Sequence, residues 1–182
     1  MSLLFEAIKN NDLRSLEKAL KGACSSDDLA VALRNTSEQG QIKLVRRLLK
    51  AGARDEWAIV AAASFAPLGT VRLLYRRIGG NLNAALIGAA AHGRLETVRF
   101  LLTLPTETLN EALADAVLRG YSETAALLLK KGADPLAPVY NYQTAMEIAV
   151  KKERREIIDL MKKTISEKTN PNMPDKKRTD AF

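Results

Sequence analysis

Apolar residues recur along the chain in pairs, and each pair is followed three to four positions later by another. Leu44 and Val45, for example, are followed by Leu48 and Leu49. This spacing places the side chains on one face of an α-helix. Runs of alanine precede several of these segments, which favours short helices that lie close against their neighbours. The pattern therefore predicts many short helices joined by tight turns.

The helical segments form repeated units. Six stretches align on the residue that ends the first helix of each, and these residues are Asn11, Gly40, Ala66, Gly93, Gly120 and Glu153. By subtraction they are separated by 29, 26, 27, 27 and 33 positions. A period of this size indicates supersecondary units that stack on one another. We therefore expect an all-α fold of about six helix–turn–helix units.

Three stretches carry a resemblance to a known family. "KKGADPLAPVYNYQTAMEIA" contains G-A-D at 132–134 and "TAME" at 144–147, while "LLKAGA" spans 48–53 and "AAAHGRLETVRFLL" spans 89–102. In these stretches the chain resembles an ankyrin-repeat protein over roughly residues 3–163, which implies an ankyrin-like helical solenoid. The proline and histidine of the family's T-P-L-H motif are missing from every unit. The hydrogen bonds that this motif provides between neighbouring units are therefore not expected here.

The connections between units differ in length. The family unit has 33 residues, and a unit cut to about 27 that retains both helices must have lost most of its connecting hairpin. Only the connection 134–143 keeps the full length. We expect this connection, called the finger below, to project from the array and to carry Val139, Tyr140 and Asn141.

Local signals mark helix ends and a domain boundary. Ser25 with Asp28, and likewise Thr108 with Glu111, have capping-box spacing. Gly40, Gly93 and Gly120 suit a left-handed turn, which Asn11 adopts less readily. After residue 165 the sequence contains two prolines and no periodic apolar face. We expect an ankyrin-like domain over 1–165 and a disordered tail over 166–182.

Composition favours a reducing, intracellular setting. Apolar residues make up 47% of the chain and aromatic residues only 5%, as expected for a core of small and aliphatic side chains. The single cysteine, Cys24, excludes an internal disulfide. The sequence contains neither a secretory signal nor an apolar run long enough for a membrane span. We expect a cytoplasmic protein, and delivery into another cell as an effector stays open.

The sequence offers little chemistry. Its one histidine, His92, stands before a turn with no serine, cysteine or second histidine beside it, and no metal-binding or phosphate-loop motif is present. We expect no catalytic residue, no metal and no cofactor, and therefore no enzymatic activity.

Positive charge suggests an alternative. There are 28 basic and 21 acidic residues, a net charge of +7, and basic doublets are spread over most units. Adjacent residues on a helix point about 100° apart, so a doublet does not form a one-sided stripe. Electrostatic binding to nucleic acid or to an anionic surface is therefore the second hypothesis.

The first hypothesis is recognition of another protein, as an adaptor, inhibitor or effector. The resemblance implies that the concave side, formed by the first helices of the units and the hairpin tips, binds a partner. Phe65, Leu118 and Tyr140 would form an apolar strip with basic ends, suited to an acidic and partly apolar segment that a monomer binds. The implied site residues are Lys9, Asn10, Glu38, Gln39, Ser64, Phe65, Ala91, His92, Leu118, Arg119, Val139, Tyr140, Asn141, Lys151 and Lys152.

Overall fold

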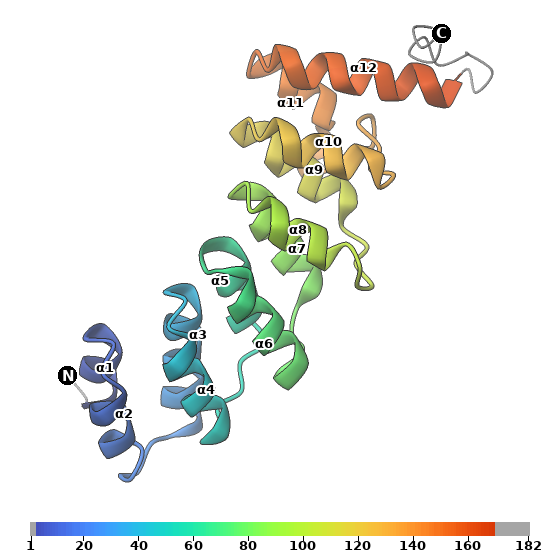
Figure 1. Cartoon of the computed structure of the whole chain (residues 1–182). Coiled ribbons are helices and arrows are strands. Elements are labelled where there is room, and N and C mark those ends of the chain that lie inside the picture. The colour runs from blue at the N-terminus through green and yellow to red at the C-terminus, as the bar shows by residue number, and fades with distance from the viewer. Residues whose placement is uncertain (1–2, 170–182) are drawn as a thin grey trace, which may run out of the picture.

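The computed structural model describes residues 3–169, and all the regular secondary structure in this part of the chain is helical (Figure 1). The described residues contain no strand, only one isolated antiparallel bridge between Pro138 and Thr144. The expectation of an all-α fold is confirmed. The helices are α1 (Leu3–Lys9), α2 (Leu13–Ala19), α3 (Ser26–Glu38), α4 (Ile42–Lys50), α5 (Ala58–Phe65), α6 (Leu68–Ile78), α7 (Leu82–Ala91), α8 (Leu95–Leu101), α9 (Leu109–Arg119), α10 (Ser122–Lys130), the short 3-10 helix η1 (Tyr140–Tyr142), α11 (Ala145–Lys151) and α12 (Arg155–Thr169).

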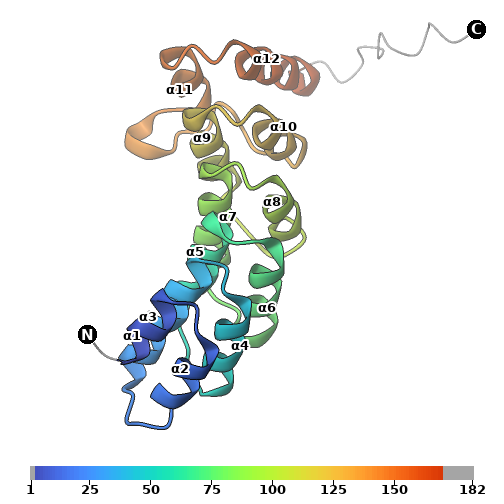
Figure 2. The same ribbon diagram turned by 60° about the vertical axis from the view of Figure 1, so that its left-hand side comes forward.

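The α-helices form six consecutive pairs arranged in two layers. The odd-numbered helices pack against one another in chain order, and so do the even-numbered ones. Figures 1 and 2 show the pairs following one another from the N-terminus to the C-terminal end of the described chain. We call the two rows the odd layer and the even layer.

Alanine allows the odd helices to lie close together. α5 buries Ala58, Ala62 and Ala63, and the next helix of the layer, α7, likewise buries Ala89 and Ala90. Small side chains bring helix backbones together and leave no void, which preserves dispersion contacts along the row. Leucines fill the wider space between the layers. Their burial stabilises the fold by about 25 cal/mol for each Å² of apolar area removed from water. The even helices supply Leu48, Leu74, Leu101 and Leu128, all fully buried.

The turn inside most pairs requires a left-handed residue. Gly40, Gly93 and Gly120 have φ values of 66°, 63° and 84°, as the sequence predicts. Asn11 and Glu153 take the same conformation without being glycine, with φ values of 50° and 54°. Ala66 is the exception, with φ −89° and ψ 164°. Proline at position 67 explains this, because the residue before a proline is driven to extended backbone.

The predicted helix caps are correct in one of two cases. Ser25 and Asp28 form the capping box at the start of α3. Thr108 makes no capping bond, so the second prediction is wrong: its hydroxyl donates instead to the carbonyl oxygen of Asn83, at 3.2 Å. A contact to the preceding unit thus replaces the local cap.

The last helix extends beyond the domain boundary that the sequence predicts. α12 continues to Thr169, so the boundary predicted at residue 165 falls inside a helix. The hydroxyl of Ser166 donates to the carbonyl oxygen of Lys163 at 2.8 Å, which places this residue in the helical turn. The rest of the predicted tail, 170–182, lies outside the described residues.

Candidate functional site

Exposed large apolar side chains belong to the odd layer and to the connections beside it. In the described part of the chain all of them lie on odd helices, in the turns that follow or precede those helices, or in the finger, and the even helices carry none. Figure 2 shows the finger, between α10 and α11, standing out on the side of the odd layer. The exposed residues are Leu3, Val31, Trp57, Phe65, Leu118, Tyr121, Leu136, Tyr140, Tyr142 and Val150.

Two side-chain contacts link neighbouring parts of the odd layer, one between the ends of α5 and α7 and the other between α9 and the finger. The rings of Phe65 and His92 meet edge to face, with centroids 4.5 Å apart. Nδ1 of His92 lies 2.9 Å from the carbonyl oxygen of Gly88, which fixes the imidazole at the end of α7. The hydroxyl of Tyr140 donates to Oδ2 of Asp115 on α9, at 3.1 Å. The finger is therefore held against the odd layer by a side-chain hydrogen bond.

Burial raises the pKa of both partners of this hydrogen bond. Burial raises the pKa of Asp115, while the Tyr140 hydroxyl and the charges of Arg119 and His92 act in the opposite direction. Burial, together with the negative charges of Asp115 and Glu111, raises the pKa of Tyr140 to about 12. Tyr140 is 45% exposed, and its hydroxyl lies within hydrogen-bonding distance of the Asp115 carboxylate.

Most residues implied as the site are accessible. Ala91 and Val139 are partly buried. The exposed members are Lys9, Asn10, Glu38, Gln39, Phe65, His92, Leu118, Arg119, Tyr140, Asn141, Lys151 and Lys152.

Ser64 is the exception, since only 7% of it is exposed and it cannot present its side chain to a partner. Its hydroxyl donates to the carbonyl oxygen of Val60 at 3.0 Å. A Cβ on Gly88 of the next odd helix would lie 2.5 Å from the same hydroxyl, so α7 covers this residue closely. The expectation that Ser64 lines the binding surface is corrected on this ground.

In three units the residue directly after the turn donates a hydrogen bond to the preceding unit, which sequence reasoning missed. The guanidinium of Arg94 donates to the carbonyl oxygen of Ala66 at 2.7 Å, and the amide of Gln41 donates to that of Ile8 at 3.0 Å. Arg154 likewise donates to the carbonyl oxygen of Leu118 at 3.3 Å. These bonds join units that lack the T-P-L-H side chains. The sequence contained a signal for these bonds, because the position after the turn holds a long polar side chain in several units.

Two asparagines at equivalent positions form a second set of links. Oδ1 of Asn83 accepts from the backbone N–H of Glu107 at 2.9 Å, and Oδ1 of Asn110 accepts from that of Asp134 at 2.7 Å. Each asparagine is the second residue of an odd helix and holds the connection that leads to the next one. The two asparagines lie one unit apart in the sequence, but no recognised motif marks their position.

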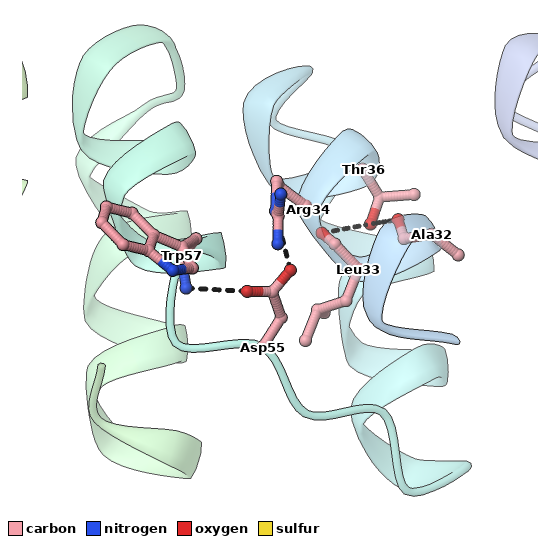
Figure 3. A network of polar contacts seen from close by, with 6 residues as sticks. All are labelled: Ala32, Leu33, Arg34, Thr36, Asp55 and Trp57. Atoms are coloured by element: carbon pink, nitrogen blue, oxygen red, sulfur yellow. Dashed lines mark hydrogen bonds and ion pairs between the residues drawn. The ribbon is translucent and has the colours of Figure 1, made fainter. Parts of the chain in front are cut away.

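A charged pair also links neighbouring units, between α3 and the start of α5. Nε of Arg34 lies 2.8 Å from Oδ2 of Asp55, whose side chain is 4% exposed, and Oδ1 of Asp55 accepts from the backbone N–H of Trp57 at 2.7 Å (Figure 3). The carboxylate thus positions the start of α5, where Trp57 is 44% exposed. The indole therefore lies at the surface of the odd layer and is not fully packed against the adjacent unit.

Comparison with known proteins gives no further guide, because no family model matches the chain and a search of curated proteins finds no match either. Among residues 3–169 there is no cluster of three or more histidine, cysteine or acidic side chains that could hold a metal ion. None of the helices described is both long and apolar enough to cross a membrane.

Proposed function

We propose that the chain is an ankyrin-like helical solenoid that binds another protein along its odd layer and has no catalytic activity of its own. The resemblance of its repeated motifs, the stacking of six helix pairs and the left-handed glycine turns support the solenoid. The proposed binding function therefore depends on which side chains the stacked units expose to a partner.

The confinement of exposed apolar side chains to the odd layer and finger carries the proposal. An exposed apolar residue by itself is ordinary, but grouping on one face marks an interaction surface. Phe65 and Leu118 are 51% and 37% exposed at the ends of α5 and α9, and Tyr140 is fixed beside α9 by Asp115. Aromatic anchors of this kind supply much of the binding free energy in protein interfaces.

The charges near this surface define the partner. Arg119 follows Leu118, and Lys151 and Lys152 end the last odd helix, so the C-terminal half of the surface offers cations to an acidic segment. Different apolar side chains of the same segment would contact Phe65 and Leu118, because α7 lies between the helices that carry them. We propose that the protein acts as a monomeric adaptor or inhibitor that binds such a segment.

A double substitution tests the surface. Phe65→Ala with Leu118→Ala should abolish capture of the principal protein that the wild-type chain retains from a matched cell extract. Loss of each hot-spot side chain weakens binding by about 2 kcal/mol, or more than tenfold. Mass spectrometry of the retained proteins identifies the partner.

The matched control substitutes two exposed residues of the even helix α10, Glu123→Ala with Lys130→Ala, which leaves the net charge unchanged. This variant should retain the partner fully. Circular dichroism must show equal helicity in all three proteins. Retention of the partner by the Phe65→Ala, Leu118→Ala variant would show that the odd layer is not the binding surface.

A further inference from the structure

Helices α4 and α6 are neighbours in the even layer (Figure 1). An open cavity of about 920 Å³ is lined by residues of these two helices and of the turn after α4. Leu49 and Leu73 supply the apolar part of its lining. All its other lining residues are basic, namely Arg46, Lys50, Arg54, Arg76 and Arg77.

These positive charges lack neutralising partners. None of the five forms an ion pair with any residue among 3–169; Arg47, which does not line the cavity, pairs with Glu17 at 3.4 Å. Two acidic residues, Asp55 and Glu56, line an adjoining cavity together with Arg54. Asp55 is paired with Arg34 at 2.8 Å, and Glu56 forms no ion pair with Arg54 or with any other residue among 3–169. Five like charges around one cavity repel one another, so an anion bound among them would be stabilised.

Helix-end electrostatics account for only some of these residues. Lys50, Arg76 and Arg77 stand in the last turns of α4 and α6, where a cation complements the helix dipole. Arg46 lies one turn before Lys50 on the same face of α4. Arg54 lies beyond the helix, where its guanidinium donates to the carbonyl oxygen of Ala53 at 2.8 Å. Their convergence on one cavity goes beyond what capping the two helices requires.

The chemistry of the lining favours phosphate. Four of the five cations are arginines, whose planar guanidinium presents paired donors that match phosphate oxygens. A phosphate monoester carries up to about two negative charges at neutral pH, whereas a carboxylate carries one. Several phosphates on one compact ligand would therefore match the cavity better than a single acidic side chain.

The shape and surroundings of the cavity favour a small, soluble ligand. Its volume falls within the range of roughly 300–1,000 Å³ that small-molecule sites occupy. No aromatic side chain lines it, so nucleic-acid bases would find no stacking platform. The even helices expose no large apolar residue among those described, so a membrane surface would gain no apolar insertion.

We propose that the cavity between α4 and α6 binds a compact, soluble ligand that carries several phosphate groups. Arg46 and Lys50 of α4 contact it from one side, and Arg76 and Arg77 of α6 from the other. This site is independent of the protein-binding surface on the odd layer.

Calorimetric titration of the full chain with inositol hexakisphosphate tests the proposal at roughly 0.15 M ionic strength. We expect one ligand to bind per chain and inositol itself not to bind. Arg46→Gln with Arg76→Gln, which removes one arginine from each helix, should weaken binding at least about tenfold. The control, Lys130→Gln with Lys131→Gln, removes the same charge from the end of α10 and should change the affinity by less than about twofold.

Equal weakening in the two variants would overturn the proposal, because it would mean that net charge alone attracts the ligand. Absence of binding to inositol hexakisphosphate would also overturn it. Binding only to vesicles that contain phosphatidylinositol bisphosphate would replace the soluble ligand with a lipid headgroup. Tighter binding of single-stranded DNA than of the polyphosphate, lost in the Arg46→Gln, Arg76→Gln variant, would replace it with nucleic acid. Since all the substituted residues are exposed, both variants should fold normally.

Discussion

At the scale of single residues, the turn after α11 retains a strained residue where three other units have glycine. Glu153 has a φ of 54°, in the left-handed region that costs a non-glycine residue roughly 1–2 kcal/mol. Glu153→Gly relieves this strain but loosens the unfolded chain, so the free energy of unfolding should rise by about 0.5–1 kcal/mol. Urea denaturation monitored by circular dichroism measures the difference.

Gly93→Ala provides the opposite case. Gly93 has a φ of 63°, and an added Cβ would lie 2.5 Å from the ring of Tyr121. Both the backbone and the contact disfavour alanine, so the free energy of unfolding should fall by roughly 1–3 kcal/mol. If Glu153→Gly were destabilising and Gly93→Ala neutral, the account of these turns would be wrong.

Tyr140 is the residue whose titration reports the position of the finger. Its pKa of about 12 lies above the ordinary value of 10, so the folded state holds the proton more tightly than the unfolded state. The contribution of this group to stability is therefore complete below about pH 10 and is lost as the pH rises toward 12. Absorbance titration of tyrosinate, with Tyr140→Phe to identify the signal, measures this pKa.

Asp115→Asn should lower the pKa of Tyr140, because it removes a negative charge but leaves an oxygen that can accept the hydroxyl proton. Burial, the larger cause, remains in this variant. An unchanged pKa would mean that the finger does not rest on α9.

At the scale of helices and their connections, side-chain hydrogen bonds link each of several units to the next. Asn110→Ala removes the acceptor for the backbone N–H of Asp134 and should lower the free energy of unfolding by about 1 kcal/mol. Asn110→Asp keeps an acceptor oxygen and should preserve most of the stability. Urea denaturation of the two variants distinguishes this specific bond from a general effect of altering α9, which would make both equally destabilising.

The sequence predicted those features that depend on neighbouring residues in the chain. Apolar spacing predicted the paired helices, and glycine predicted the turns at Gly40, Gly93 and Gly120. The length of the connection 134–143 predicted that it would project. These signals are local, because helical periodicity and left-handed backbone each require particular residues at particular spacings.

Features that depend on contacts with a neighbouring unit could not be predicted from local sequence. Ser64 is buried because Gly88 of the following odd helix allows close approach, and Thr108 bonds to Asn83 of the preceding unit in place of capping its own helix. The cavity between α4 and α6 likewise depends on side chains of two units converging. Doublets in the sequence suggested only distributed charge, since a list of basic residues does not show which of them face one another.

At the scale of the whole molecule, the two layers present different chemistry. Among the described residues, the odd layer and finger expose the large apolar side chains, while the even layer holds the cavity with five basic residues. A row of stacked units has two long faces, and partners of different chemistry can therefore bind at the same time. The central claim is that the apolar face is the one that receives a protein.

Site-specific photo-cross-linking tests that claim most directly. A benzophenone amino acid would be placed singly at Val31 or Tyr140 in the odd layer and finger, and at Lys43 or Arg99 in the even layer, all of which are exposed. Cross-links to the captured partner should form from the first two positions and not from the last two. Cross-links that form only from Lys43 and Arg99 would contradict the account and place the partner on the even layer.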